Sequence, residues 1–241
     1  TRLVSDWSSD VCSSDLVMRN AIRTIKAAWN RTDTVVMASN FGSFTLFIGN
    51  CWWESVTVCI LASAIPIFFQ CLRAVFVRDS LTPAIAFGAI IGAGWPIGEG
   101  LVTASVGWWG EYLAPGPMVW HTPIYCMLIG WLASTHIFYV SRRTAEMGFS
   151  HRVTIGNTVV SAALLGVIGE NLFVAARMWV YHPSDLDWFS VPAFVPIAYG
   201  IGYGILPLVR RSHVVHASAA VCATLLVVSV GLGLAVGFFP R

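Results

Sequence analysis

The sequence predicts an all-α integral membrane protein built from about seven transmembrane helices, and two observations support this. The chain has 241 residues, of which 56% are hydrophobic and only 11% are charged, whereas about a quarter of a soluble domain is charged. Seven apolar stretches are also long enough to cross a hydrocarbon core of about 30 Å. They lie at residues 34–53, 56–75, 81–106, 121–140, 153–179, 191–209 and 214–238.

The N-terminal region divides into two parts before the first apolar stretch. Residues 5–16, SDWSSDVCSSDL, resemble the translation of a common sequencing adapter, so residues 1–16 are set aside as an artefact. Residues 17–33 carry Arg19, Arg23, Lys26 and Arg31 and are expected to be a cytoplasmic segment. A single transmembrane domain then covers residues 34–238. Its first two stretches meet around residues 50–54, where one broken or re-entrant element is an alternative to two helices.

The arginines predict the orientation of the chain. Besides the N-terminal group, Arg73 and Arg78 follow the second stretch, Arg142, Arg143 and Arg152 follow the fourth, and Arg210 and Arg211 follow the sixth. Seven helices place all of these loops on one side and leave only Arg177 and Arg241 on the other. The positive-inside rule then puts the N-terminus in the cytoplasm. A formal net charge of +2 that is spread over such loops does not predict a nucleic-acid partner.

A tandem repeat of a helix pair occupies the middle of the chain, in units of about 81–143 and 153–211. The triplet Ile-Gly-Glu occurs at 97–99 and again at 168–170. The surroundings match as well, pairing Leu101 with Leu172, Ala104 with Ala175, Trp108 with Trp179, Tyr112 with Tyr181, Trp120 with Trp188 and Pro123 with Pro192.

The two repeated glutamates are the strongest candidates for a functional role. Glu99 and Glu170 each precede a tryptophan by nine residues, or about 13 Å of helix, which places both near mid-membrane. Intramembrane carboxyls usually face a protein interior, and apolar surroundings favour their protonated form. Both glutamates are therefore expected to line one cavity as general acids. The alternative is that they are protonated and only hydrogen-bond neighbouring helices.

Aromatic residues gather near the non-cytoplasmic ends of the predicted helices. An interfacial belt explains many of them, but the excess on one side also favours an aromatic-walled cavity that opens toward the outer leaflet, where ring faces stabilise a cation. The candidate substrate-binding residues are Trp53, Trp95, Trp108, Trp179, Tyr181 and Arg177.

Several kinds of cofactor chemistry are disfavoured by the residues present. The cysteines outside residues 1–16 show no C-x-x-C spacing and are expected to be packing residues. No histidine boxes or H-E-x-x-H motif predict a metal, and the one lysine, Lys26, precedes the first apolar stretch, which excludes a retinal Schiff base. Acidic clusters for magnesium diphosphate are also missing. We therefore expect no metal and no cofactor.

Two short patches resemble the small integral-membrane terpene cyclases of fungal meroterpenoid and indole-diterpene pathways. Residues 50–54 have the form N-x-x-W-E, and residues 177–183, RMWVYHP, followed by Trp188 and Pro192, are similar to a run before that family's last helix. The resemblance implies a compact bundle that protonates an epoxide or alkene without metal, with Glu54 matching the family's essential glutamate.

The sequence thus favours a multi-pass cell-membrane protein that acts on a hydrophobic small molecule. We expect an isoprenoid cyclase or hydratase, terpene- or carotenoid-like, with Glu54, Glu99 and Glu170 as candidate acids. The alternatives are a proton-coupled carrier of a small apolar or amphipathic solute and a non-enzymatic membrane subunit.

Overall fold

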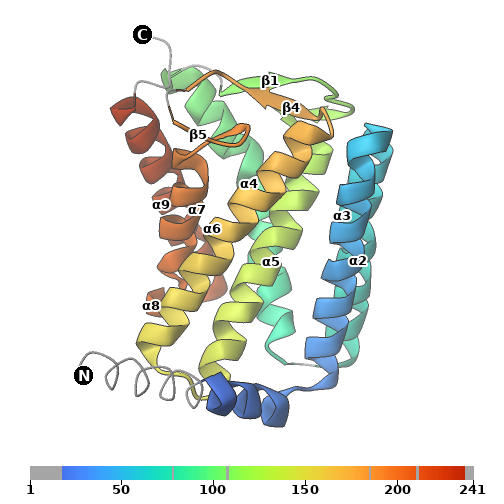
Figure 1. Ribbon diagram of the computed structural model, residues 1–241, viewed down its shortest axis with the longest axis vertical. Helices are drawn as coiled ribbons and strands as arrows, with labels where there is room; N and C mark the ends of the chain where they lie inside the picture. Colours follow the sequence, from blue (N-terminus) through green and yellow to red (C-terminus); the bar gives the residue numbers. More distant parts are fainter. Residues whose placement is uncertain (1–17, 78, 107–108, 185, 210–211, 237–241) are drawn as a thin grey trace, which may run out of the picture.

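The computed structural model describes residues 18–77, 79–106, 109–184, 186–209 and 212–236, which form a bundle of upright helices crossed at one end by short strands (Figure 1). A short helix at residues 18–28 lies across the opposite end. The helices of the bundle are α2 (Arg31–Trp53), α3 (Val56–Phe76), α4 (Leu81–Val106), α5 (Ile124–Glu146), α6 (His151–Ala175), α7 (Phe194–Gly204), α8 (Leu206–Val209) and α9 (Val214–Ala235).

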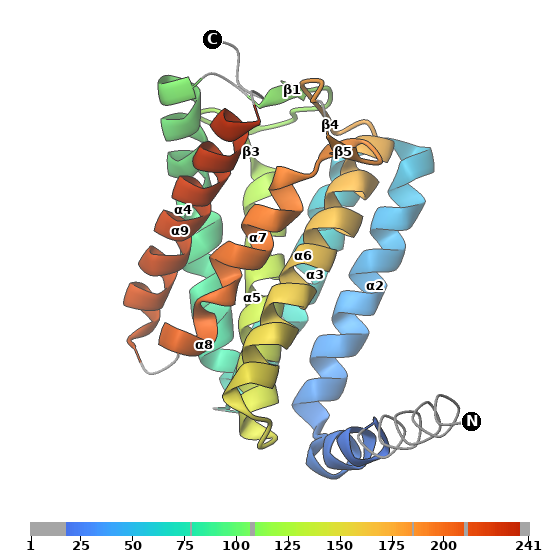
Figure 2. The same ribbon diagram turned by 60° about the vertical axis from the view of Figure 1, so that its left-hand side comes forward.

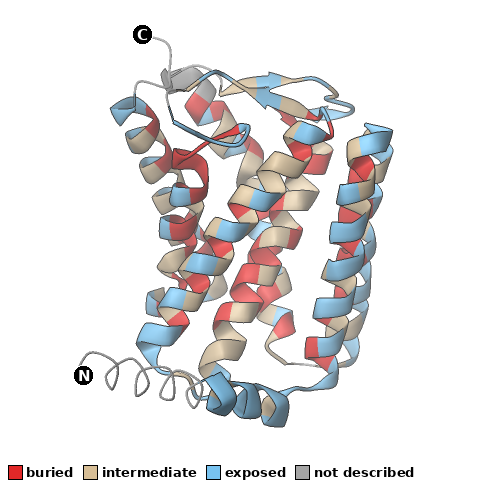
Figure 3. Cartoon of the chain, viewed as in Figure 1, coloured by how far each residue is buried: buried red, intermediate tan, exposed pale blue. Residues whose placement is uncertain are grey.

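Five of these helices, α3, α4, α5, α6 and α9, are long and apolar enough to cross a membrane. α7 and α8 together make a shorter apolar run. α2 is a continuous helix, but its apolar sequence is interrupted by the polar residues Asp33, Asn40 and Asn50. The outer faces of the helices are also apolar: Phe41, Phe68, Phe76 and Val227 are all exposed. Figure 3 shows the buried residues on the inner faces. This pattern is typical of a membrane protein, since a soluble monomer rarely leaves large apolar patches in water.

Each predicted apolar stretch contains a helix, but the ends differ where the chain turns. α5 begins at Ile124, and α6 ends at Ala175, after which Arg177 adopts a left-handed backbone with φ 54°. Trp179 therefore lies in a strand and not on a continuation of the helix. The assumption of a continuous helix from Glu170 to Trp179 is wrong, because only the five steps from Glu170 to Ala175 are helical.

The joint between α2 and α3 is a tight turn between two full helices, which lie side by side in Figures 1 and 2. Glu54 ends α2 in the left-handed region, with φ 48°. Asn50 Oδ1 accepts a hydrogen bond from the Ser55 backbone N–H at 3.0 Å, and Ser55 Oγ caps the start of α3. Residues 31–76 thus form a hairpin of two helices, of 23 and 21 residues, and not one broken element.

The two repeat units contain the same order of elements. α4 is followed by β1 (Gly110–Tyr112), the hairpin of β2 (Met118–Val119) and β3 (Thr122–Pro123), and α5; α6 is followed by β4 (Trp179–Tyr181), the hairpin of β5 (Asp187–Trp188) and β6 (Val191–Pro192), and α7. β1 pairs antiparallel with β4, and Tyr112 lies opposite Trp179. The two strands cross the end of the bundle (Figure 1).

The hairpins correct one pair of the predicted repeat. Trp120 and Phe189 both have positive φ, 56° and 62°, and both begin the two-residue turn of their hairpin. The structural counterpart of Trp120 is therefore Phe189 and not Trp188. Pro123 and Pro192 do occupy equivalent positions, because each ends the second strand of its hairpin.

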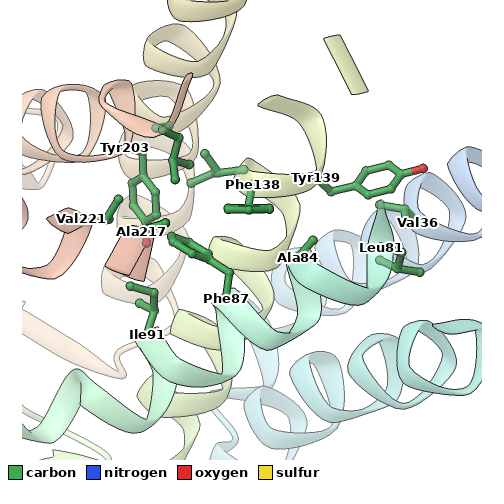
Figure 4. Close-up of a cluster of buried hydrophobic side chains, with 13 residues drawn as sticks. Val36, Leu81, Ala84, Phe87, Ile91, Phe138, Tyr139, Tyr203, Ala217 and Val221 are labelled. Carbon is green, nitrogen blue, oxygen red and sulfur yellow. The ribbon is translucent and has the colours of Figure 1, made fainter. Parts of the chain in front are cut away.

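Helix α5 lies at the centre of the bundle and packs against α3, α4 and α6, while α9 packs against α4 and α7 (Figure 2). The rings of Phe87 on α4 and Phe138 on α5 stack with centroids 4.6 Å apart (Figure 4). α4 and α5 approach closely because Gly88 has no side chain: a Cβ there would lie 2.4 Å from the Trp131 carbonyl oxygen. Small residues at such contacts let membrane helices pack tightly.

A buried ion pair joins α2 to α5 at the end of the bundle away from the strands. Arg143 Nε donates to Asp33 Oδ1 and Arg143 Nη2 to Asp33 Oδ2, both at 2.8 Å. The Tyr139 hydroxyl donates to the same carboxylate at 2.7 Å. We call Asp33, Tyr139 and Arg143 the Asp33 clamp.

Candidate functional site

A cavity of about 820 Å³ lies inside the bundle, within the range of small-molecule sites. Its walls come from α2, α4, α5, α6, α7 and α9, and β1 and β4 contribute at the end that the strands cross. Most of the lining side chains are apolar. Glu99 and Glu170 both line this cavity, so the two repeated carboxyls share one site.

The Glu99 carboxyl is held by side chains from three elements. Trp95, one turn earlier on α4, donates its Nε1–H to Glu99 Oε1 at 3.0 Å. The Tyr112 hydroxyl, on β1, donates to the same oxygen at 2.7 Å. The Thr122 hydroxyl, on β3, donates to Glu99 Oε2. The strand and hairpin that follow α4 thus fold back and fix the carboxyl of that helix.

The Glu170 carboxyl is held in a similar way by tyrosines. The Tyr181 hydroxyl, on β4, donates to Glu170 Oε2 at 2.7 Å, as Tyr112 does to Glu99 in the first repeat. The Tyr199 hydroxyl, on α7, donates to Glu170 Oε1 at 2.6 Å. Trp179 also lies within hydrogen-bonding reach of this carboxyl.

The two halves differ in which helix supplies the large ring beside the acid. In the first half Trp95 comes from the helix of the acid and packs over Gly130 of α5, where a Cβ would lie 3.0 Å from the indole ring. In the second half Tyr199 comes from the following helix and packs over Gly166 of α6, where a Cβ would lie 2.7 Å from the phenol ring. Each acid thus has one large ring beside it that faces a glycine. In the first half the ring is on the helix of the acid and the glycine on the next helix, and in the second half this arrangement is reversed.

The hydrogen bonds leave each carboxyl able to carry a proton. An indole N–H only donates, so Glu99 Oε1 must accept from Trp95. A hydroxyl both donates and accepts, so a proton on Glu99 Oε2 keeps a partner in Thr122. Glu170 faces tyrosine hydroxyls at both oxygens. Each site therefore holds exchangeable protons at the cavity wall.

The sequence-predicted residues separate into two groups. Trp95, Trp179 and Tyr181 line the cavity together with the two glutamates, whereas Trp108 lies outside the described residues. Glu54, Trp53 and Arg177 are not among the lining residues. The Glu54 side chain is 45% exposed and pairs with Arg177 at 3.7 Å, and Trp53 is 60% exposed. Glu54 therefore does not share a site with Glu99 and Glu170.

Sequence reasoning missed four polar groups that line or hold the site. The pairing with Tyr181 signalled Tyr112, but Thr122 and Tyr199 have no counterparts in the repeat that would have identified them. His136 lines the cavity and is the one histidine well inside a predicted span, which was a usable signal.

Within the described ranges, no group of three or more His, Cys, Asp or Glu side chains is arranged to hold a metal ion. No family model, no curated protein and no solved structure matches this chain.

Proposed function

We propose that this chain is a membrane-embedded isoprenoid cyclase or hydratase, in which Glu99 or Glu170 starts carbocation chemistry by protonating the substrate. One observation carries the proposal: two intramembrane carboxyls, each held by tyrosine or threonine hydroxyls, face one large and mainly apolar cavity. Two acids with matched tyrosines exceed what helix association requires. A neutral carboxyl in an apolar site is a general acid.

The proposed reaction needs only a proton and the substrate. The carboxyl transfers its proton to an alkene carbon or an epoxide oxygen, which leaves a carbocation on the substrate and a carboxylate on the protein. A neighbouring double bond attacks the cation and closes a ring. Loss of a proton from the cyclised cation to the carboxylate then restores the acid. In a hydratase, water adds to the cation instead, and the proton that the added water loses to the carboxylate restores the acid.

Aromatic rings near the acids are suited to stabilise such a cation. Trp179 lies against Phe173, with ring centroids 4.7 Å apart, and edge-on to Tyr112 at 6.2 Å. Trp109 and Trp179 both line the cavity. Ring faces attract a cation within about 6 Å of the centroid, and the bundle keeps bulk water from the intermediate.

A lipophilic substrate is proposed to enter from the side of the bundle. The sequence predicts a cavity that opens toward the outer leaflet, but β1 and β4 lie over that end of the bundle (Figure 1). The lining residues with high exposure are instead on the flanks of the helices, such as Ile97 at 61% on α4 and Leu164 at 53% on α6. A mouth on such a flank opens directly to lipid.

We further propose seven membrane crossings, by α2 to α6, by α7 with α8, and by α9, with the N-terminus in the cytoplasm. The helix at residues 18–28 supports this orientation. Met18, Ile22 and Ile25 follow helical spacing, so they share one face. Arg19, Arg23 and Lys26 accompany them. A basic amphipathic helix of this kind lies in the interface and favours an anionic cytoplasmic leaflet.

Cysteine labelling tests the orientation. In a background without other cysteines, Glu111→Cys on β1 is expected to react with an impermeant maleimide from outside intact cells. His151→Cys, at the exposed start of α6, should react only after the membrane is opened. Both sites label in detergent as a control for reactivity. Labelling of both positions from the same side would rule out a single membrane crossing, by α5, between them.

The role proposed for Trp179 predicts a change in products. Trp179→Leu removes a ring face that is worth roughly 0.5–2 kcal/mol to a nearby cation, so competing products should shift by roughly 2- to 30-fold in ratio. Trp179→Phe keeps a ring face and is expected to stay closer to the parent. Chromatography of lipid extracts measures the ratio. An unchanged ratio in both variants would contradict a role for this ring.

Lipid-extract product analysis in an isoprenoid-producing host tests the proposed function itself. The enzyme is expected to create a compound that is absent from a strain with an empty vector. The second candidate, a proton-coupled carrier, is favoured by the two similarly ordered halves around one cavity, which is also a feature of transporters with parallel repeats. A carrier makes no new compound but moves a solute across vesicles that contain the protein.

A further inference from the structure

A chain of hydrogen bonds leads from α3 through α2 to His136 on α5. Ser39 Oγ donates to the Val36 carbonyl at 3.1 Å. Gln70 Nε2 donates to Ser39 Oγ at 3.0 Å and to Asn40 Oδ1 at 3.1 Å. Asn40 Nδ2 lies 2.7 Å from His136 Nδ1. These contacts tie three helices to one imidazole ring.

The direction of each bond follows from the first. A carbonyl has no hydrogen to give, so the single Ser39 hydroxyl hydrogen goes to Val36 and Ser39 Oγ accepts from Gln70. The Gln70 nitrogen then also faces Asn40 Oδ1, which makes Asn40 Nδ2 the group that donates to His136. A donor directed at Nδ1 requires that nitrogen to be unprotonated. The ring is therefore neutral and carries its proton on Nε2.

The Nε2–H of His136 is left for a ligand. Among the described residues it has no hydrogen-bond partner, and both His136 and Asn40 line the cavity. A donor in an apolar site is costly unless it is paired. Within the described part of the chain no lysine or arginine lines the cavity, so a phosphate or carboxylate would find no counter-charge there. The matching partner is a neutral oxygen.

We infer that His136 is a binding subsite for a neutral, hydrogen-bond-accepting oxygen of an amphipathic cavity ligand. His136 follows Cys126 by ten residues, about 15 Å along α5, and Cys126 Sγ lies 3.8 Å from the Tyr112 hydroxyl beside Glu99. A ligand with a hydroxyl, ketone or epoxide oxygen at His136 thus extends its apolar chain toward the two acids. The inference rests on the proposed function only in taking the apolar chain of the ligand to be an isoprenoid.

Paired probes test the subsite with the full chain in nanodiscs. Geranylgeraniol is compared with the isoprenoid hydrocarbon of the same length, and hexadecanol with hexadecane, by the change in tryptophan emission as the ligand displaces water from the cavity. The preference for the alcohol over its hydrocarbon is expected to fall roughly 2- to 12-fold in His136→Phe, the effect of one hydrogen bond. His136→Gln, which keeps an N–H donor, should recover most of it. Glu54→Gln, whose side chain does not line the cavity, is the control that should keep the preference.

The tautomer is tested separately by ¹⁵N NMR of histidine-labelled protein, with His136→Gln used to assign the signal. Nε2 is expected to be protonated and Nδ1 not, and Asn40→Leu should release this preference. A proton on Nδ1, or an alcohol preference that persists in His136→Phe in both probe pairs, would overturn the subsite. An effect of His136 on hexadecanol with no binding of either isoprenoid would instead reject the isoprenoid class and leave the oxygen subsite standing.

Discussion

Glutamine in place of Glu99 or Glu170 is expected to lower turnover by roughly 10²- to 10⁴-fold, the usual effect of losing a general acid. The fold should persist, because the amide is nearly isosteric with the neutral acid. In Glu99→Gln the amide oxygen still accepts from Trp95, and the amide nitrogen donates to the Thr122 hydroxyl. In Glu170→Gln the amide faces two tyrosine hydroxyls, which also donate or accept.

Glu54→Gln is the matched control for these two variants. The Glu54 side chain is 45% exposed, pairs with Arg177 and does not line the cavity, so its loss should leave turnover unchanged. Each purified variant is checked by thermal melting and assayed with linear isoprenoid epoxides and polyenes. If both cavity variants keep the turnover of a parent that converts a substrate, acid initiation is wrong. If the parent converts none and moves a solute, the protein is a carrier.

Breaking the Asp33 clamp is expected to lower the free energy of unfolding by about 3–5 kcal/mol, as for other buried ion pairs that lose one partner. The Asp33 and Arg143 side chains are only 4% and 12% exposed. Arg143→Leu leaves the Asp33 carboxylate with the Tyr139 hydroxyl and the Asn30 backbone N–H but with no counter-charge. Asp33→Asn removes the buried charge that the guanidinium faces and leaves Arg143 its pair with the more exposed Glu146 at 3.0 Å. Titration with SDS in mixed micelles measures the loss.

Arg142→Leu provides the control, because Arg142 makes only a half-exposed pair with Glu146 at 3.8 Å, and such pairs contribute about 0–1 kcal/mol. The double variant Asp33→Asn/Arg143→Leu should lose less than the sum of the single variants, since the two residues interact directly. Equal losses for Arg142→Leu and Arg143→Leu would show that the clamp does not stabilise the bundle.

The sequence by itself determined the helical segments and the pair of acids. Long apolar stretches specify helices because backbone groups in lipid must pair within their own segment. A glutamate inside such a stretch can be recognised without knowing which face of the helix it occupies. The repeat also aligned Tyr112 with Tyr181. These are local properties, or comparisons of one segment with another, so they can be read along the chain.

Only the tertiary structure decided which groups surround the acids. Thr122 reaches Glu99 and Tyr199 reaches Glu170 because the chain reverses after α4 and α6 and because β1 pairs with β4. The exchange of ring and glycine between the halves hides these contacts from a comparison of the repeats. Glu54 lies in a stretch that resembles a terpene-cyclase motif, yet its turn between α2 and α3 leaves it at the surface. Contacts between segments depend on how the helices pack, and apolar patterns that suit many packings do not specify one.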